Sequence, residues 1–113
     1  MDGSRRAIQT ERVTVYIVGH IDITDPETYA GYEEGFREIF QRYDGEFLAV
    51  DDDSLMLEGD KGHTRTVIVR FPDRAGALAW FQSEAYQELA AIRWRASTAQ
   101  ISLIEGIEHE GTK

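Results

Sequence analysis

The sequence contains no cysteine, only two prolines and no hydrophobic run long enough to cross a bilayer. Without cysteine the chain has no disulfide, no thiolate nucleophile and no cysteine-ligated metal, which fits a reducing cytoplasm. Residues 1–13 also lack the apolar core of a signal peptide. We therefore expect a soluble, cytoplasmic protein.

Basic residues are also few, because 12 lysines and arginines stand against 21 acidic residues and give a formal net charge of -9. Phosphate backbones and anionic lipid surfaces are held mainly by lysine and arginine. Neither nucleic acid nor a membrane is an expected partner. The 113 residues, 42% hydrophobic and 29% charged, have the composition of one ordinary globular domain.

Several motifs of cofactor chemistry are missing. The chain has no G-x-G-x-x-G, no phosphate-binding loop and no G-x-S-x-G nucleophile elbow. The three histidines are far apart, and the acidic run 51–53 lacks the ligand spacing and central glycine of a calcium loop. We predict a solvated turn at 51–53, no metal site and no cofactor.

The first half of the chain predicts a strand and a long helix. Residues 13–21 are rich in β-branched and aromatic types on both faces, as in a strand covered from both sides. Thr24 or Asp25 is suited to cap the helix that follows, with Pro26 in its first turn. Aromatic and aliphatic residues then recur every three or four positions and predict one buried stripe: Tyr29, Tyr32, Phe36, Ile39, Phe40 and Tyr43.

The second half predicts three more strands and a broken helix. Asp44-Gly45 ends the first helix, and strands are expected at 46–50, continuing after a break at 55–58, and at 63–71. Asp73 caps a helix in which Ala75, Leu78 and either Ala79 or Phe81 face inward. Ser83 breaks this helix and caps a second piece, 84–95, before a last strand at 96–105. The inner stripe of the second piece is Tyr86, Leu89, Ala90 and Arg93.

The element order β-α-β-β-α-β predicts an α+β fold of the ferredoxin-like kind, with two helices on one face of a four-stranded antiparallel sheet. The domain spans residues 13–107, between polar tails at 1–12 and 108–113. The second sheet face stays bare in this arrangement. A second copy covers it most simply, so we expect a homodimer whose sheets stack as a dimeric α+β barrel.

The chain resembles the domain-of-unknown-function family 1330 (DUF1330), a member of the dimeric α+β barrel superfamily. The resemblance rests on Asp25-Pro26-Glu27 with Tyr29 and Tyr32, on Gly45 and Phe71-Pro72, on Ala79-Trp80-Phe81, on Ser83-x-x-Tyr86, on Arg93 and on Glu105-Gly106. It implies a dimer with a pocket between helices and sheet, and no established reaction. It also implies Ser83, Tyr86 and Arg93 as pocket residues.

Arg93 is the most informative candidate, since it falls on the side of its helix that is expected to be buried. A buried guanidinium requires an anionic partner. One interpretation is an ion pair with Glu58 that only orients the helix. The other is that Arg93 binds the carboxylate of a small molecule, because arginine recognises carboxylates with two parallel hydrogen bonds.

Further candidates give the competing functions. His20 and Tyr32 form the best acid/base pair of the sequence and point to a cofactor-independent oxygenase or isomerase. Trp80 is a candidate for lining an apolar pocket together with Phe81. Packing alone also explains the histidine, the tyrosines and the tryptophan. The predicted functions are thus a protein that binds a carboxylate-bearing or aromatic molecule, an enzyme, or a structural dimer without ligand.

Overall fold

The computed structural model describes residues 13–107, so the predicted tails 1–12 and 108–113 lie outside the described residues. The elements follow in the order β1 (Val15–Ile23), α2 (Pro26–Phe40), a short 3-10 helix (Gln41–Tyr43), β2 (Glu46–Asp51), β3 (Arg65–Phe71), α3 (Arg74–Phe81), α4 (Glu84–Ala96) and β4 (Ser97–Glu105). The predicted ferredoxin-like order is confirmed.

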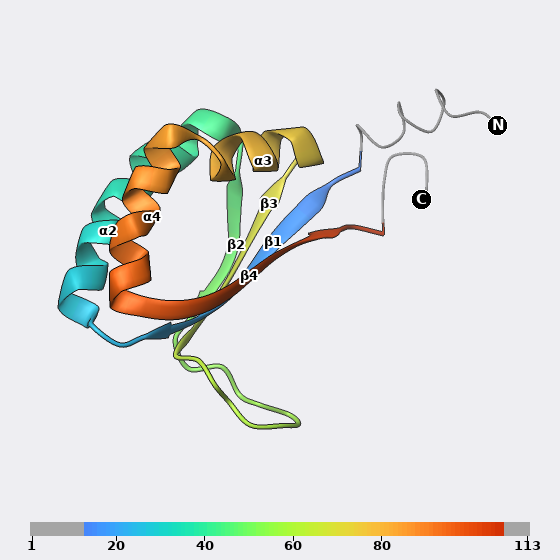
Figure 1. Ribbon diagram of the computed structural model, residues 1–113. Helices are drawn as coiled ribbons and strands as arrows, with labels where there is room; N and C mark the ends of the chain where they lie inside the picture. Colours follow the sequence, from blue (N-terminus) through green and yellow to red (C-terminus); the bar gives the residue numbers. More distant parts are fainter. Residues whose placement is uncertain (1–12, 108–113) are drawn as a thin grey trace.

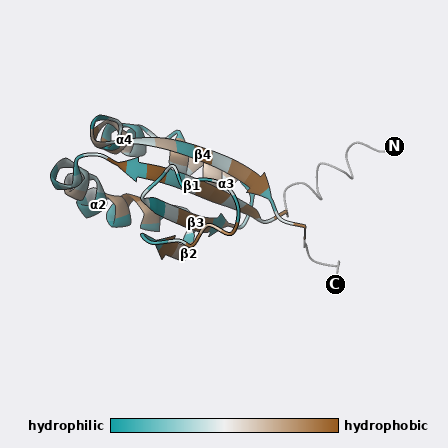
Figure 2. Ribbon diagram, turned by 90° about the horizontal axis from the view of Figure 1, so that it is seen from below, coloured by the Kyte–Doolittle hydropathy of each residue, from teal (hydrophilic) through white to brown (hydrophobic). Residues whose placement is uncertain are grey.

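The strands form one antiparallel sheet in the order β2-β3-β1-β4, and α2, α3 and α4 all lie on the same side of it (Figure 1). Alternation along β1 buries Val15, Ile17 and Ile21 against the helices and turns Tyr16, Val18 and His20 to the other face. Brown, apolar segments concentrate in the strands in Figure 2. Within residues 13–107, no element covers the second sheet face.

The helix boundaries follow the predicted capping chemistry. The Asp25 carboxylate accepts from the Thr28 amide at the start of α2, where Pro26 is the first helical residue. The Asp73 carboxylate accepts from Gly76 N–H, and the Ser83 hydroxyl accepts from Tyr86 N–H. The break at Ser83 is therefore confirmed. Asp44 ends the first helical segment with a φ of 60°.

Two local predictions are wrong. Residues 55–58 are not a strand but part of an exposed loop between β2 and β3, in which Leu55 and Leu57 are 82% and 90% exposed. The irregularity expected there lies instead within β2, where the pairing with β3 shifts between Phe47 and Ala49. In α3 the buried residues are Ala77 and Trp80, because Trp80 has the largest apolar surface to bury.

The core between the helices and the sheet is mainly aromatic. The Trp80 ring stacks on Phe71 at 5.5 Å and lies 4.5 Å from the Tyr86 ring, and Phe36 and Phe40 pack against the same cluster. Such ring pairs add roughly 0.5–1.5 kcal/mol each beyond the area they bury. This cluster holds α2, α3 and α4 over β3 and β1.

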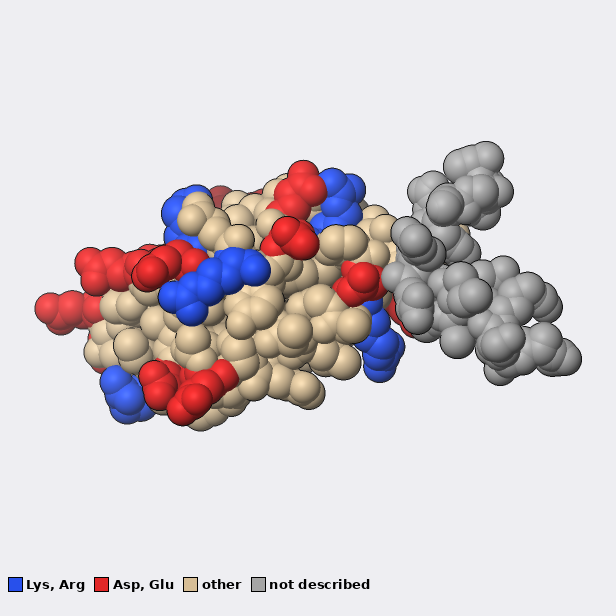
Figure 3. Space-filling model, turned by 90° about the horizontal axis from the view of Figure 1, so that it is seen from above, with Lys and Arg blue, Asp and Glu red and all other residues tan. Residues whose placement is uncertain are grey.

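The surface reflects the excess of acidic residues. On the face seen in Figure 3, lysine and arginine side chains are scattered among acidic groups around a larger uncharged area, without a continuous basic patch. Within residues 13–107, no helix is both long enough and apolar enough to cross a membrane.

Candidate functional site

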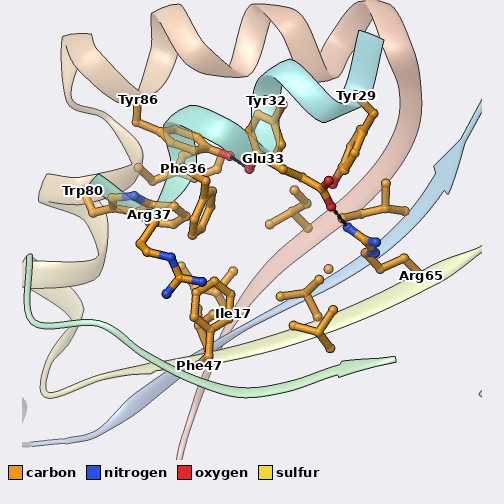
Figure 4. A pocket seen from close by; sticks show the side chains of 17 residues that line it. Ile17, Tyr29, Tyr32, Glu33, Phe36, Arg37, Phe47, Arg65, Trp80 and Tyr86 are labelled. Atoms are coloured by element: carbon orange, nitrogen blue, oxygen red, sulfur yellow. Dashed lines mark hydrogen bonds and ion pairs between the residues drawn. The ribbon is translucent and has the colours of Figure 1, made fainter. Parts of the chain in front are cut away.

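A cavity of about 320 Å³ lies between the sheet and the helices (Figure 4). Its wall consists of aliphatic residues from the strands and aromatic residues from the helices: Ile17, Gly19, Ile21, Val67, Val69, Ile101, Tyr29, Tyr32, Phe36, Trp80, Phe81 and Tyr86. Its rim carries Glu33, Arg37, Phe47, Val50 and Arg65. A volume near the lower end of the 300–1,000 Å³ typical of ligand sites suits a small ligand.

The strands and helices supply this wall through their ordinary periodicities. Every second residue of β1 faces the helices, and Gly19 leaves open the space that a side chain between Ile17 and Ile21 would fill. On α2 the predicted stripe brings Tyr29, Tyr32 and Phe36 to the same side. The mouth lies between α2 and the edge strand β2, where Phe47 and Val50 are 40% and 52% exposed.

A hydroxyl pair is buried in the wall of this cavity. The hydroxyls of Tyr32 and Tyr86 lie 2.8 Å apart and share a hydrogen bond between α2 and α4. Burial raises the pKa of Tyr32 well above its ordinary value, and the neighbouring Tyr86 hydroxyl raises it further. Tyr32 is therefore neutral at physiological pH, so its hydroxyl is able to donate a hydrogen bond but does not serve as a base.

Arg93 lies behind this pair and not in the cavity wall. Its side chain is buried, as predicted, with the residue 4% exposed and the guanidinium carbon 5.7 Å from the centre of the Tyr32 ring. Burial by itself lowers the pKa of Arg93, yet the hydroxyls of Tyr86 and Tyr32 beside the guanidinium raise it above its ordinary value. Among residues 13–107, its Nε atom has no hydrogen-bond partner.

The predicted partner of Arg93 is elsewhere. Glu58 is exposed in the loop between β2 and β3, and no ion pair joins it to Arg93 within the described residues. The prediction of this pair is wrong because residues 55–58 do not continue the sheet toward α4. Arg93 is held instead by the face of Tyr32 and by the phenol groups.

His20 and Tyr32 do not form an acid/base pair. His20 is exposed on the sheet face away from the helices, whereas Tyr32 lies in the cavity on the helix side. The one-residue offset of a strand decides the face, so Ile21 reaches the cavity and His20 does not. His20 instead lies beside His63, with 4.7 Å between the ring centres, and His63 shares a hydrogen bond with Thr66.

Of the remaining predicted residues, some line the cavity and one stabilises the junction of two helices. Trp80 and Tyr86 line the cavity, as their predicted pocket role requires. Ser83 does not line it, because its hydroxyl donates to the Trp80 carbonyl and accepts from Tyr86 N–H, which places it at the junction of α3 and α4. The Nε1 atom of Trp80 is buried among rings and has no hydrogen-bond partner within the described chain.

An ion cluster at the rim was missed by sequence reasoning. The Arg65 guanidinium makes two hydrogen bonds to the Asp52 carboxylate, at 2.6 and 3.1 Å, and a further ion pair with Glu33, while it lies 5.6 Å from the Tyr29 ring. The hydrogen bonds to Asp52 raise the pKa of Arg65, and the same bonds lower the pKa of Asp52. The predicted acidic turn is exposed to solvent, but one of its residues, Asp52, also pairs with Arg65 and so connects the loop to β3.

No sequence signal identified this cluster. Glu33 occurs on the polar side of the predicted helix, Asp52 in the predicted turn, and Arg65 is one of the alternating polar residues of its strand. Among residues 13–107, no group of three or more histidine or acidic side chains is arranged to hold a metal ion. The arrangement therefore offers a small aromatic cavity, a pair of hydrogen-bonded phenol groups and charged groups at its mouth.

Comparisons with known proteins agree on the fold. A comparison with curated proteins gives no match. Among solved structures, the chain is similar to RPA0582 of Rhodopseudomonas palustris, a protein of unknown function, with 15% identity, coverage of 94% of this chain and 92% of that one, and a TM-score of 0.73.

Two other solved structures share the fold at low identity. One is SnoaB, a cofactor-independent oxygenase from Streptomyces nogalater, with 17% identity over 89% of this chain and 99% of that one, and a TM-score of 0.62. The other is a dimeric ferredoxin-like protein of unknown function from Thermobifida fusca, with 8% identity over 83% of this chain and 92% of that one, and a TM-score of 0.59. Residues 14–107 match the family described as "Domain of unknown function (DUF1330)", and the chain belongs to this family.

Proposed function

We propose that the protein binds a small aromatic molecule in the cavity between helices and sheet. The observation that carries this proposal is an aromatic and aliphatic wall around about 320 Å³ of space that opens between α2 and β2. Small-molecule sites are typically concave and lined mainly by hydrophobic and aromatic side chains with a few polar groups, as this cavity is. A cavity beside Tyr32 favours ligand binding over the alternative of a purely structural dimer.

Trp80 provides a direct signal for the test, because it lines the cavity while Trp94, the other tryptophan, is exposed. In a Trp94→Phe background, titration with benzamide, which does not emit in the range of tryptophan, is expected to change the emission of Trp80 with a saturable curve. Calorimetry is expected to show saturable binding of 2-naphthamide and indole-3-acetamide. Cyclohexanecarboxamide is the aliphatic control and binds more weakly, since it does not stack on the rings. Absence of saturable binding by all three aromatic amides, with benzamide followed by fluorescence and the other two by calorimetry, contradicts the proposal.

Thermal denaturation gives an independent readout. A ligand that binds only the folded state at about 100 times its Kd stabilises a protein by about 2.7 kcal/mol. For a domain of this length that corresponds to an increase in Tm of roughly 10–20 °C. The aromatic probes are therefore expected to raise Tm in proportion to their measured affinity.

A second candidate function, a cofactor-independent oxygenase or isomerase, is supported by the hydroxyl pair of Tyr32 and Tyr86 in the cavity wall. SnoaB carries out oxygenase chemistry on the same fold, although fold alone is a weak guide to reaction. Since Tyr32 is neutral, the Tyr32–Tyr86 pair donates a hydrogen bond to the oxyanion that forms when an enol or activated phenol releases its proton to water at the cavity mouth. In the oxygenase case, molecular oxygen is the co-substrate.

This candidate is tested with phenylpyruvate, by following its keto–enol interconversion and its oxygen consumption. Tyr32→Phe is expected to lower turnover by about 100-fold or more, as for loss of an oxyanion donor. Tyr43→Phe, outside the cavity lining, is the matched control with unchanged turnover. Wild-type turnover in Tyr32→Phe, or no turnover above the uncatalysed rate in the wild-type protein, excludes this reaction for the pair.

We also propose that the protein is a homodimer in which the second sheet face packs on the same face of another copy. This face carries Tyr16, Val18, Ile68 and Ile104, and no described element covers it. The similar protein from Thermobifida fusca is dimeric. Sedimentation of the wild-type protein at twice 12.9 kDa, and of Ile68→Glu at 12.9 kDa, is expected. A wild-type monomer at all concentrations contradicts this assembly.

A further inference from the structure

Arg37 lies at the mouth of the cavity and has no acidic partner among residues 13–107. Glu33 precedes it by four residues on α2, which is the spacing and order that favours a helical ion pair. The Glu33 carboxylate, however, pairs with Arg65 on β3. Within residues 13–107, no ion pair joins Arg37 to any carboxylate, and the same is true of Arg95 on α4. Arg42, Arg70 and Arg74 each have one.

The Arg37 side chain extends from α2 toward Phe47 (Figure 4), and both residues line the cavity. The surroundings of the mouth make this position unusual. Phe47 and Val50 give it an apolar edge, and the charge of Arg65 is balanced by Asp52 and Glu33. Two carboxylates thus share the single charge of Arg65, and Arg37 is the guanidinium of the rim that pairs with no carboxylate among residues 13–107.

We infer that Arg37 binds the carboxylate of an aromatic acid whose ring lies in the cavity. This inference rests on the proposed function and adds the chemical class of the ligand. The ring packs among Phe36, Trp80 and Tyr86, and the carboxylate stays at the mouth, where water keeps its desolvation cost low. A guanidinium binds a carboxylate through two parallel N–H···O bonds, which also fixes the direction of the ligand.

This assignment differs from the prediction for Arg93. Both are arginines that lack a carboxylate partner among the described residues, but Arg93 is covered by Tyr32 and lies outside the cavity lining. A ligand in the cavity reaches Arg37 without moving α2 or α4. Arg37 is thus a ligand-binding residue, and Arg93 supports the Tyr32–Tyr86 pair from behind.

The test uses matched acids and amides: 2-naphthoate with 2-naphthamide, indole-3-acetate with indole-3-acetamide, and benzoate with benzamide. Calorimetry of the full-length protein is expected to show each acid binding about tenfold more tightly than its amide, as a partly exposed charge-assisted hydrogen bond provides. Higher salt is expected to reduce this preference, because it screens the charge of the exposed guanidinium.

Arg37→Gln is expected to remove the preference for acids and leave the affinity for amides within about twofold, since it deletes the charge and keeps a long side chain. Arg42→Gln is the matched control, because Arg42 follows on the same helical segment and pairs with Glu38 away from the cavity lining. An acid preference that survives in Arg37→Gln refutes the role of Arg37, as does equal affinity of acids and amides in the wild-type protein. Failure of acids and amides alike refutes the proposed function itself.

Discussion

Gly19→Leu places a side chain directly in the cavity, because Gly19 faces the helices between Ile17 and Ile21. A β-carbon at Gly19 would lie 3.7 Å from Ile21 Cδ1 and 3.8 Å from Ile101 Cγ1, which are ordinary van der Waals contacts. A larger side chain at this position extends into free space and does not displace the packed core.

The expected change in stability follows from two terms. Glycine in the interior of a strand costs about 0.5–1 kcal/mol relative to alanine, so Gly19→Ala raises the free energy of unfolding by about that amount. Each further buried carbon adds at most about 0.8 kcal/mol, so Gly19→Leu is expected to raise the free energy of unfolding by about 1–3 kcal/mol. The same side chain occupies the ligand's space, and we expect it to weaken 2-naphthamide binding at least tenfold, or about 1.4 kcal/mol.

Urea denaturation and calorimetric titration of the same samples measure both effects. Gly62→Leu is the control, because Gly62 lies in the exposed loop with no atom within 4 Å of the added β-carbon. If Gly19→Leu folds with unchanged affinity for 2-naphthamide, the probe binds outside the cavity and the proposed site is refuted. A loss of stability in Gly19→Leu contradicts the open space on which the magnitude depends.

Three further predictions concern the framework of the site. Gly45→Ala is expected to lower the free energy of unfolding by about 1–3 kcal/mol or more in urea denaturation, because the added carbon overlaps the Phe40 ring and comes within 2.9 Å of Phe71 Cζ. In the control Gly62→Ala, the free energy of unfolding changes by no more than about 0.5 kcal/mol. Tyr32→Phe and Tyr86→Phe are each expected to cost about 1–2 kcal/mol, and the double variant less than their sum, since it leaves no unpaired hydroxyl; additive losses contradict the hydrogen bond. Acidification is expected to release the loop at 52–64, because the pKa of Asp52 is lowered in the folded state. The stabilisation by the Asp52–Arg65 ion pair is complete above the ordinary pKa of about 4 and is lost as the pH falls through the lowered pKa. Proteolysis within 52–64 that rises at acid pH in the wild-type protein, and already at neutral pH in Asp52→Asn, is the measurement; an equal rate in both proteins at neutral pH contradicts the tie to Arg65.

The sequence by itself determined the order of the elements, their helix starts and the family. Asp25, Asp73 and Ser83 cap helices as predicted, since a cap depends on a hydroxyl or carboxylate and the next three residues. The stripe of α2 and the burial of Arg93 also followed from sequence, because helical spacing alone brings those residues to one side. The cytoplasmic location and the dimer stay predictions.

The tertiary structure alone decided which polar groups meet. The sequence suggested that His20 and Tyr32 act together, yet they lie on opposite sides of the sheet. Alternate residues of a strand face opposite sides, and His20 faces away from the helices. Glu33 has a suitable partner four residues away in Arg37 and still pairs with Arg65, which is 32 residues distant in the chain. Spacing along the sequence indicates which residues could pair with Glu33, but the tertiary packing brings Glu33 to Arg65. As a result, Arg37 is left without this partner at the mouth of the cavity.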